Sequence, residues 1–149
     1  MNIHKILASG FGLGYAPKAP GTFGSLLGLA LGTALLSLGH LPLLFGIVIV
    51  SGLGIHTITR LPEAATQDPG WIVIDEIAGQ MIPLLALTGP SIPGILLCFA
   101  LFRLFDIFKP GPVAWADRRH DAYGVMGDDL IAGGLAWLVV LALHLVSPL

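Results

Sequence analysis

The chain has 149 residues, of which 55% are hydrophobic and only 11% are charged, and its mean hydropathy is +0.89. Soluble domains carry about 25% charged residues, so this composition favours an integral membrane protein over a very apolar soluble helical bundle. The net charge of -2 argues against a nucleic-acid partner, which requires a basic face.

The sequence predicts a single domain over residues 1–149, because no repeat or linker divides it. Its one cysteine, Cys98, lies in an apolar run and cannot form an internal disulfide. The first residues, MNIHKILASGFGLG, do not have the pattern of a cleavable signal, because their apolar run is short and broken by glycines.

Five apolar segments follow one another along the chain. Before them, a Gly- and Pro-rich start over residues 1–21 is expected to interrupt helices rather than build them. The apolar segments are residues 22–39, 43–59, 71–89, 94–109 and 129–146. Most are about 17–19 residues long, near the lower limit for crossing the hydrocarbon core of a bilayer. We therefore predict an all-α fold, a small polytopic membrane bundle of about five apolar helices joined by short turns.

The charged residues gather at one end of these helices. If the connections alternate between two faces, one face receives residues 1–21, 60–71 and 109–128. All 7 Lys and Arg and all 9 Asp and Glu lie in these segments or within about two turns of them. Because Lys and Arg favour the cytoplasmic side, we predict a multi-pass protein of the cytoplasmic membrane, with its N-terminus inside, its C-terminus outside and its charged groups at the cytoplasmic face.

Carboxylates lie near three of the predicted helix ends. Asp75 and Glu76 come about one turn into the third apolar segment, Asp106 lies about one turn before the end of the fourth, and Asp128 and Asp129 open the fifth. Antiparallel packing would bring these ends to one membrane face. Mg²⁺ takes oxygen ligands from carboxylates, water and substrate phosphate. The pattern therefore predicts a metal site with the ligands Asp75, Glu76, Asp106 and Asp129.

Cationic side chains flank the carboxylate of the fourth segment. Arg103 and Lys109 lie three residues before and after Asp106, so they project from neighbouring strips of one helix face. The planar fork of arginine suits phosphate oxygens, and both cations are assigned to the substrate phosphate. Free N–H groups at a helix start also bind anions, which adds Thr22 and the preceding Lys18 as substrate-binding candidates. The predicted catalytic residues are Arg103, Asp106, Lys109 and Asp129.

Two glycines follow carboxylates by four residues, Gly79 after Asp75 and Gly133 after Asp129. A glycine one turn deeper in a helix lets another helix or a substrate approach closely. The spacing therefore predicts tight packing next to the charged site.

Several of these residues also have a purely structural interpretation. Arg103 and Asp106 could form only an ion pair, although ionisable groups at membrane depth are functional by default. Asp128 or Asp129 could cap the N-terminus of the fifth helix. Asp117, which follows the rigid KPGP turn, stays open between structure and function. A solvated or headgroup-facing surface is expected for Glu63, Asp68, Arg118, Arg119 and Asp121.

Three blocks of the sequence together resemble the phosphatidylglycerophosphatase A family: GLGYAPKAPGTFGSLLG, then VIDEIAGQMI, then FRLFDIFKPGPVAWADRR with GVMGDDLIAG. They follow in this order across most of the chain, and the block around FRLFDIFKP is the most specific. The resemblance implies a Mg²⁺-dependent phosphatase of the bacterial inner membrane. Its substrate would be the phospholipid phosphatidylglycerophosphate, and its products phosphatidylglycerol and inorganic phosphate. The late loop, HDAYGVMGDD, departs slightly from the more glycine-rich approach expected before the Asp pair.

Other membrane functions fit the sequence less well. A small carboxylate-based ion transporter would need polar groups that continue to the other face, where only scattered Ser, Thr and His residues and Gln80 lie. A headgroup transferase of the CDP-alcohol type would carry a D-x-x-D-G…G…D-x-x-x-D spacing, and a histidine-based lipid phosphatase would carry paired histidines. Neither pattern is present. The nucleophile, water or an aspartate, and the oligomeric state stay open at this point.

Overall fold

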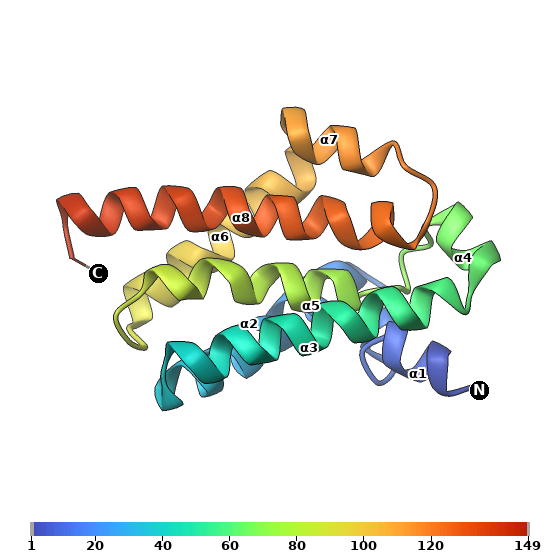
Figure 1. Ribbon diagram of the computed structural model, residues 1–149, viewed down its shortest axis with the longest axis horizontal. Coiled ribbons are helices and arrows are strands. Elements are labelled where there is room, and N and C mark those ends of the chain that lie inside the picture. Colours follow the sequence, from blue (N-terminus) through green and yellow to red (C-terminus); the bar gives the residue numbers. More distant parts are fainter. Residues whose placement is uncertain (1, 149) are drawn as a thin grey trace.

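The structure is a computed structural model that describes residues 2–148, and within that range every regular element is a helix (Figure 1). The predicted all-α fold is therefore confirmed. In chain order the α-helices and the two short 3₁₀ helices η1 and η2 are α1 Ile3–Ala8, η1 Leu13–Tyr15, α2 Pro20–Leu38, α3 His40–Thr59, α4 Pro62–Gln67, α5 Ile74–Met81, η2 Ile82–Ala86, α6 Ile92–Phe108, α7 Gly111–Asp117 and α8 Ala122–Val146.

The first, second and fourth apolar segments form continuous helices, as the sequence predicts. α2 begins at Pro20, which suits a first turn because that position needs no N–H donor. Gly39 separates α2 from α3 with a φ of 129°, a conformation that side chains rarely adopt. α6 begins after Ser91, whose Oγ accepts a hydrogen bond from the Gly94 N–H at 3.2 Å.

The third apolar segment does not form one long helix. α5 has eight residues and passes into the 3₁₀ helix η2 at Ile82. Pro83 in η2 lacks an N–H donor, and its ring crowds the carbonyl four residues earlier, so the α-helix cannot continue through it. With about 1.5 Å of rise per α-helical residue and about 2 Å per 3₁₀ residue, α5 and η2 together span about 22 Å, less than the roughly 30 Å hydrocarbon core.

Three helices are long and apolar enough to cross a membrane: α2, α3 and α8. α6 has 17 residues and falls just short of their length, and α5 with η2 is shorter still. Each of the five predicted apolar segments thus contains a helix, but among the described residues only three of these helices have the length of a membrane span.

Two stretches that the sequence predicts as irregular are partly helical. Within the Gly- and Pro-rich start, residues 3–8 form α1, because Asn2 caps it by accepting a hydrogen bond from the Lys5 N–H at 2.9 Å. The connection expected over 109–128 contains α7 and the first turns of α8, which begins at Ala122. The expectation of irregular chain is wrong for both. Side-chain caps start α1 and α8, whereas α7 begins after Pro110 without a side-chain cap and has a proline in its first turn, a position that needs no N–H donor.

Asp121 caps the N-terminus of α8. Its Oδ1 accepts a hydrogen bond from the Gly124 N–H at 2.8 Å, the bond typical of an N-cap. Asp128 and Asp129 lie about two turns inside the helix. The interpretation of either as the N-cap is therefore wrong, and both carboxylates are available for another role.

α5 lies at the centre of the bundle, between α8 on one side and α2 and α3 on the other (Figure 1). Seven of its eight residues are buried. Glycines at the crossings allow this: a Cβ on Gly28 of α2 would lie 2.4 Å from the Ile77 carbonyl oxygen, and a Cβ on Gly133 of α8 would lie 2.3 Å from the Gly79 carbonyl oxygen. The predicted close approach at Gly79 and Gly133 is confirmed.

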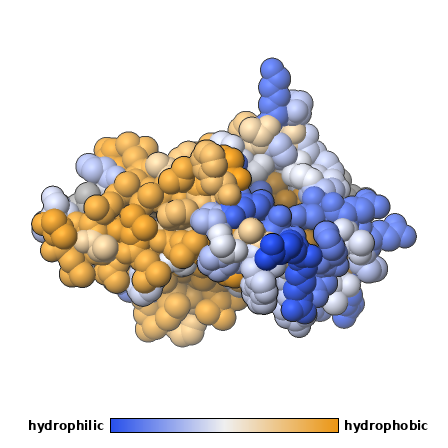
Figure 2. All heavy atoms as spheres, turned by 90° about the horizontal axis from the view of Figure 1, so that it is seen from above, coloured by the Kyte–Doolittle hydropathy of each residue, from blue (hydrophilic) through white to orange (hydrophobic). Residues whose placement is uncertain are grey.

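The molecule has an apolar end and a polar end (Figure 2). Hydrophobic residues cover the end that carries the α2–α3 turn and the last turns of α8, and hydrophilic residues gather at the end where α1, α4 and the start of α8 lie. Large apolar side chains on the long helices are exposed, among them Phe45 and Val48 at 59% and 60%. Such a surface suits contact with lipid, and the separation matches the predicted gathering of charge at one end.

Candidate active site

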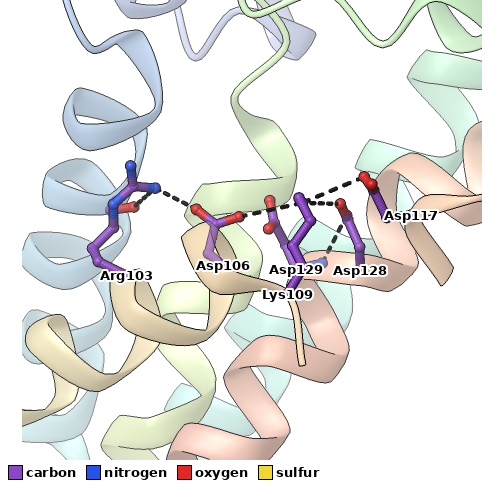
Figure 3. A network of polar contacts seen from close by, with 7 residues as sticks. Arg103, Asp106, Lys109, Asp117, Asp128 and Asp129 are labelled. Atoms are coloured by element: carbon purple, nitrogen blue, oxygen red, sulfur yellow. Dashed lines mark hydrogen bonds and ion pairs between the residues drawn. The ribbon is translucent and has the colours of Figure 1, made fainter. Parts of the chain in front are cut away.

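Three helix ends meet at the polar end of the bundle, as antiparallel packing predicts (Figure 3). They are the first turn of α5, the last turn of α6 and the early part of α8. Asp75, Asp128 and Asp129 each offer one oxygen, and these oxygens lie within 4.8 Å of one another. Lys109, which ends α6, donates a hydrogen bond to Asp128 Oδ2 at 2.9 Å. The three ends therefore form one charged cluster.

Asp75 and Asp129 are held in the interior of the protein, where they are 6% and 2% exposed. The glycine crossing of α5 and α8 holds them there, since a Cβ on Gly79 would lie 2.5 Å from the Asp129 carbonyl oxygen. The Oδ1 atoms of both aspartates, and Oε2 of Glu76, are buried without a hydrogen-bond partner in the part of the chain that the structure describes. An uncompensated buried carboxylate costs several kcal/mol, so this arrangement suits a bound cation.

The donor atoms of this group indicate which cations it could hold. Its three carboxylates supply only oxygen, and no cysteine or histidine belongs to it. Hard ions such as Mg²⁺, Ca²⁺ and Mn²⁺ prefer such ligands, whereas Zn²⁺ sites are usually built with sulfur or imidazole. The acidic cluster could therefore bind a hard divalent metal ion.

Lys109 is the cationic centre of the cluster. Its Nζ lies 2.9 Å from Asp128 Oδ2, 3.3 Å from Asp117 Oδ1 and 4.0 Å from Asp106 Oδ1. Burial lowers the pKa of Lys109, but the hydrogen bond from Lys109 to Asp128 and the nearby carboxylate charges outweigh burial and raise that pKa above its ordinary value. Lys109 is therefore charged and already engaged with carboxylates.

Arg103 lies on the other side of Asp106 (Figure 3). Its Nη1 forms an ion pair with Asp106 Oδ2 and lies 3.5 Å from the Ser25 Oγ. A Cβ on Gly21 would lie 3.5 Å from the same Nη1 and 2.7 Å from Glu76 Oε1, so the start of α2 adjoins both charged groups. The Asp106 and Ser25 contacts both use Nη1, and a guanidinium has five N–H donors in all. Within residues 2–148, the donors of Arg103 other than Nη1 are therefore left for an anion.

Negative charge at the start of α5 is not fully compensated. Burial raises the pKa of Glu76 to about 7. Burial also raises the pKa of Asp75 well above its ordinary value, and the charge of Glu76 adds to this effect. Both shifts have the sign expected where carboxylates are buried together with too few cations.

The structure brings together two of the four predicted metal ligands. Asp75 and Asp129 belong to the group of three carboxylates, whereas Glu76 and Asp106 lie outside it. Asp106 is instead paired with Arg103. The structure therefore shows the ion pair between Arg103 and Asp106 that the sequence allows, and a catalytic role for either residue stays a prediction.

The two candidates at the start of α2 are less closely tied to the cluster. Thr22 is half-buried, and its N–H already donates to the Ala19 carbonyl oxygen at 3.0 Å. Lys18 is exposed on the loop before α2. Substrate binding by Thr22 and Lys18 stays a prediction.

Sequence reasoning missed Asp68 and left Asp117 open, yet both lie next to Asp128. One oxygen each from Asp68, Asp117 and Asp128 lie within 4.8 Å of one another. Asp68 ends α4 and Asp117 ends α7, and both of these short helices fall in stretches predicted as polar connections. No local signal marks Asp68, because its approach to Asp128 depends on the packing of segments far apart in sequence.

The arrangement as a whole combines opposite charges at close range. Buried carboxylates suited to a metal ion lie next to a guanidinium with free donors, at the polar end of an apolar bundle. A guanidinium held in place, and a metal ion bound by such carboxylates, can stabilise the charge that develops on a phosphoryl group during its transfer. The site is therefore suited to the cleavage of a phosphate ester at a membrane surface.

Comparisons with known proteins agree with this chemistry. The family model described as Phosphatidylglycerophosphatase A matches residues 6–144. The chain is 40% identical over 147 residues to the "Phosphatidylglycerophosphatase A" of Haemophilus influenzae, covering 97% of this chain and 90% of that protein. It is 35% identical over 132 residues to the protein of that name from Escherichia coli, covering 86% and 76%.

A third relative carries a different name. A protein of Bacteroides thetaiotaomicron named "Putative phosphatidylinositol-3-phosphatase" is 34% identical over 142 residues, covering 91% of this chain and 89% of that protein. No solved structure matches the chain.

Proposed function

We propose that this chain, which belongs to the phosphatidylglycerophosphatase A family, hydrolyses phosphatidylglycerophosphate to phosphatidylglycerol and inorganic phosphate. The observation that carries the proposal is the cluster of buried carboxylates next to Arg103, at the polar end of an apolar bundle. A phosphorylated lipid needs a binding protein with an apolar and a polar end, because its acyl chains stay in the bilayer while its phosphate lies at the polar face.

Mg²⁺ is the metal that we assign to Asp75, Asp128 and Asp129. Their oxygen-only donor set and the two partnerless buried oxygens support this choice. When bound, such an ion neutralises phosphate charge and lowers the pKa of a coordinated water. The assignment adds Asp128 to the ligands expected from the sequence and leaves Glu76 and Asp106 at the edge of the site.

Arg103 is the group that we assign to the substrate phosphate. Its ion pair with Asp106 fixes the guanidinium, and the pair is largely shielded, with 18% and 11% of the two side chains exposed. A guanidinium held in place can bind two phosphate oxygens at once. Asp106 therefore acts as a positioning residue that orients Arg103, and Arg103 is the catalytic candidate of the pair.

The polar end is assigned to the cytoplasmic face of a bacterial membrane. Lysines and arginines favour that face in membrane proteins, and the relatives of this chain are bacterial. With this orientation α2, α3 and α8 cross the membrane, and the phosphorylated headgroup reaches the site from the cytoplasm.

Phosphate release from phosphatidylglycerophosphate in mixed detergent micelles tests the proposal. Activity is expected with Mg²⁺, and it is expected to vanish with a chelator and return on Mg²⁺ addition. Asp129→Asn keeps the size of the side chain but removes a ligand charge, so we expect kcat to fall by about 100-fold or more, the usual cost of a lost contact to a developing charge.

Glu63→Gln is the matched control, because it makes the same change at an exposed residue outside both carboxylate groups. Its turnover is expected to equal that of the wild type. Full activity in metal-free buffer, or wild-type turnover in Asp129→Asn, contradicts the proposed mechanism.

A second candidate substrate is a phosphorylated inositol lipid, because one close relative is named for that activity. The same cluster would serve, since both substrates present a phosphate monoester on a lipid headgroup. Comparing kcat/KM for phosphatidylglycerophosphate and phosphatidylinositol 3-phosphate decides between them. A higher value for the inositol lipid would replace the proposed substrate and leave the proposed chemistry intact.

A further inference from the structure

The carboxylate cluster contains two adjacent cation positions, and a side chain of the protein takes one of them. Resting on the metal dependence proposed above, we propose that the Lys109 ammonium permanently fills the second position, so that the site accepts a single divalent ion. Lys109 is then a positioning residue. It supplies the positive charge that the second ion supplies in a two-metal site.

The two positions share Asp128. One is formed by Asp75, Asp128 and Asp129, and the other by Asp68, Asp117 and Asp128. In each group every aspartate offers one carboxylate oxygen, and these three oxygens lie within 4.8 Å of one another. A carboxylate has two oxygens and can bridge two cations. Metal ions in two-metal phosphatase sites lie about 3.5–4 Å apart, so the shared aspartate makes this geometry accessible.

The two positions differ in the cation that the chain provides. Lys109 Nζ lies 2.9 Å from Asp128 Oδ2 and 3.3 Å from Asp117 Oδ1, so it pairs with two of the three carboxylates of the second group. Asp75 and Asp129 form no ion pair with the described residues, and each has a buried oxygen without a partner. The first position is therefore open to a metal ion, while the second already contains the Lys109 ammonium.

The environment of Asp128 makes a cation at the second position necessary. Asp128 is 4% exposed, and its Oδ1 already accepts a hydrogen bond from the Asp129 N–H at 2.8 Å. Removing one partner of a buried ion pair leaves a buried charge uncompensated, which is strongly unfavourable. If Lys109 is removed, Asp128 Oδ2 and Asp117 Oδ1 face each other without a cation, and a divalent ion is the natural replacement.

The backbone of Lys109 allows a clean test of this role. Lys109 ends α6 in the left-handed conformation, with a φ of 48° and a ψ of 61°. Glycine is the usual residue there, because a side chain in this conformation costs about 1 kcal/mol. Lys109→Gly therefore removes the ammonium and relieves the backbone at the same time, so the variant is expected to fold.

Counting bound Mn²⁺ by electron paramagnetic resonance on the purified full chain in detergent tests the proposal. Mn²⁺ accepts the same oxygen ligands as Mg²⁺. Wild type is expected to bind one ion per chain, and Lys109→Gly two, with the broadened spectrum of neighbouring ions. Lys109→Met, which keeps much of the apolar length of the side chain, is expected to bind two as well, so the result does not depend on one variant.

Two controls place the extra ion. In the Lys109→Gly background, Asp68→Asn removes a ligand of the second position and is expected to return the count to one. Arg118→Gln removes an exposed cation that makes no ion pair with the cluster, and its count is expected to stay at one. A count of two for wild type, or of one for both Lys109 variants, overturns the proposal. A count of zero for wild type overturns the proposed metal dependence itself.

Discussion

Gly133→Ala is the sharpest test of how the fold forms the site. A Cβ on Gly133 would lie 2.3 Å from the Gly79 carbonyl oxygen and 3.1 Å from the Ile82 Cβ. Carbon and carbonyl oxygen normally approach no closer than about 3.3 Å, so α8 must move away from α5 by about 1 Å. The Gly79 atom belongs to the backbone, and no rotamer change can relieve the contact.

The displacement acts directly on the proposed metal ligands. Asp75 lies on α5, while Asp128 and Asp129 lie on α8. Ligand distances in metal sites hold within about 0.2 Å, so a separation of about 1 Å breaks the site, and misplacement on this scale costs about 100-fold in rate. Forcing a methyl group into a packed contact also costs about 1–3 kcal/mol of stability.

The assay combines phosphate release at a series of Mg²⁺ concentrations with thermal unfolding in detergent. Gly134→Ala is the matched control, since it makes the same change one residue along α8, where a Cβ would have nothing within 4 Å. Alanine stabilises a helix by about 1 kcal/mol relative to glycine, so the control is expected to be active and slightly more stable. Wild-type turnover and an unchanged Mg²⁺ requirement in Gly133→Ala would refute the reasoning.

Two further predictions concern the start of α8 and the orientation of the chain. Asp121→Ala removes the N-cap bond to the Gly124 N–H, so the melting temperature is expected to fall by the equivalent of about 1 kcal/mol. The Mg²⁺ requirement should not change, and a shifted requirement would mean that the cap also shapes the site. Reporter fusions after Arg60 and after Leu149 are expected to report opposite sides of the membrane, with Arg60 in the cytoplasm. Two cytoplasmic signals would contradict the proposed topology.

The location of the site could be predicted because charge is scarce in this chain, which has 16 charged residues in 149 when its 7 basic and 9 acidic residues are added. Apolar segments of similar length must pack antiparallel, so carboxylates at alternate ends meet at one face. The glycines could be predicted for a related reason. Where two helices cross closely, a small residue has to lie at the point of contact. Gly79 and Gly133 lie one turn from Asp75 and Asp129, so their spacing predicts a close crossing next to the site.

The identity of the carboxylates that share a cation could not be predicted in this way. Neighbouring residues on a helix point about 100° apart, so Asp128 and Asp129 cannot be told apart until the rotation of α8 is known. α8 also begins at Ala122, seven residues before the predicted start at 129, because Asp121 caps it. Asp68 is harder still to predict from the sequence. It ends α4 with a left-handed backbone φ of 46°, and only the packing of α4 brings it close to Asp128.

The short central helix explains how a strongly apolar chain can contain so many buried carboxylates. α5 is enclosed by α2, α3 and α8, so Asp75 is shielded by protein and does not meet lipid. Asp75 and Glu76 both lie in the first turn of α5, at the polar end of the bundle, and η2, which follows, contains no carboxylate. Within the protein, Arg103, Lys109 and a metal ion can offset the free-energy cost of burying these carboxylates. The third apolar segment therefore contributes Asp75 and Glu76 to the polar end of the bundle although its helices are too short to cross the membrane.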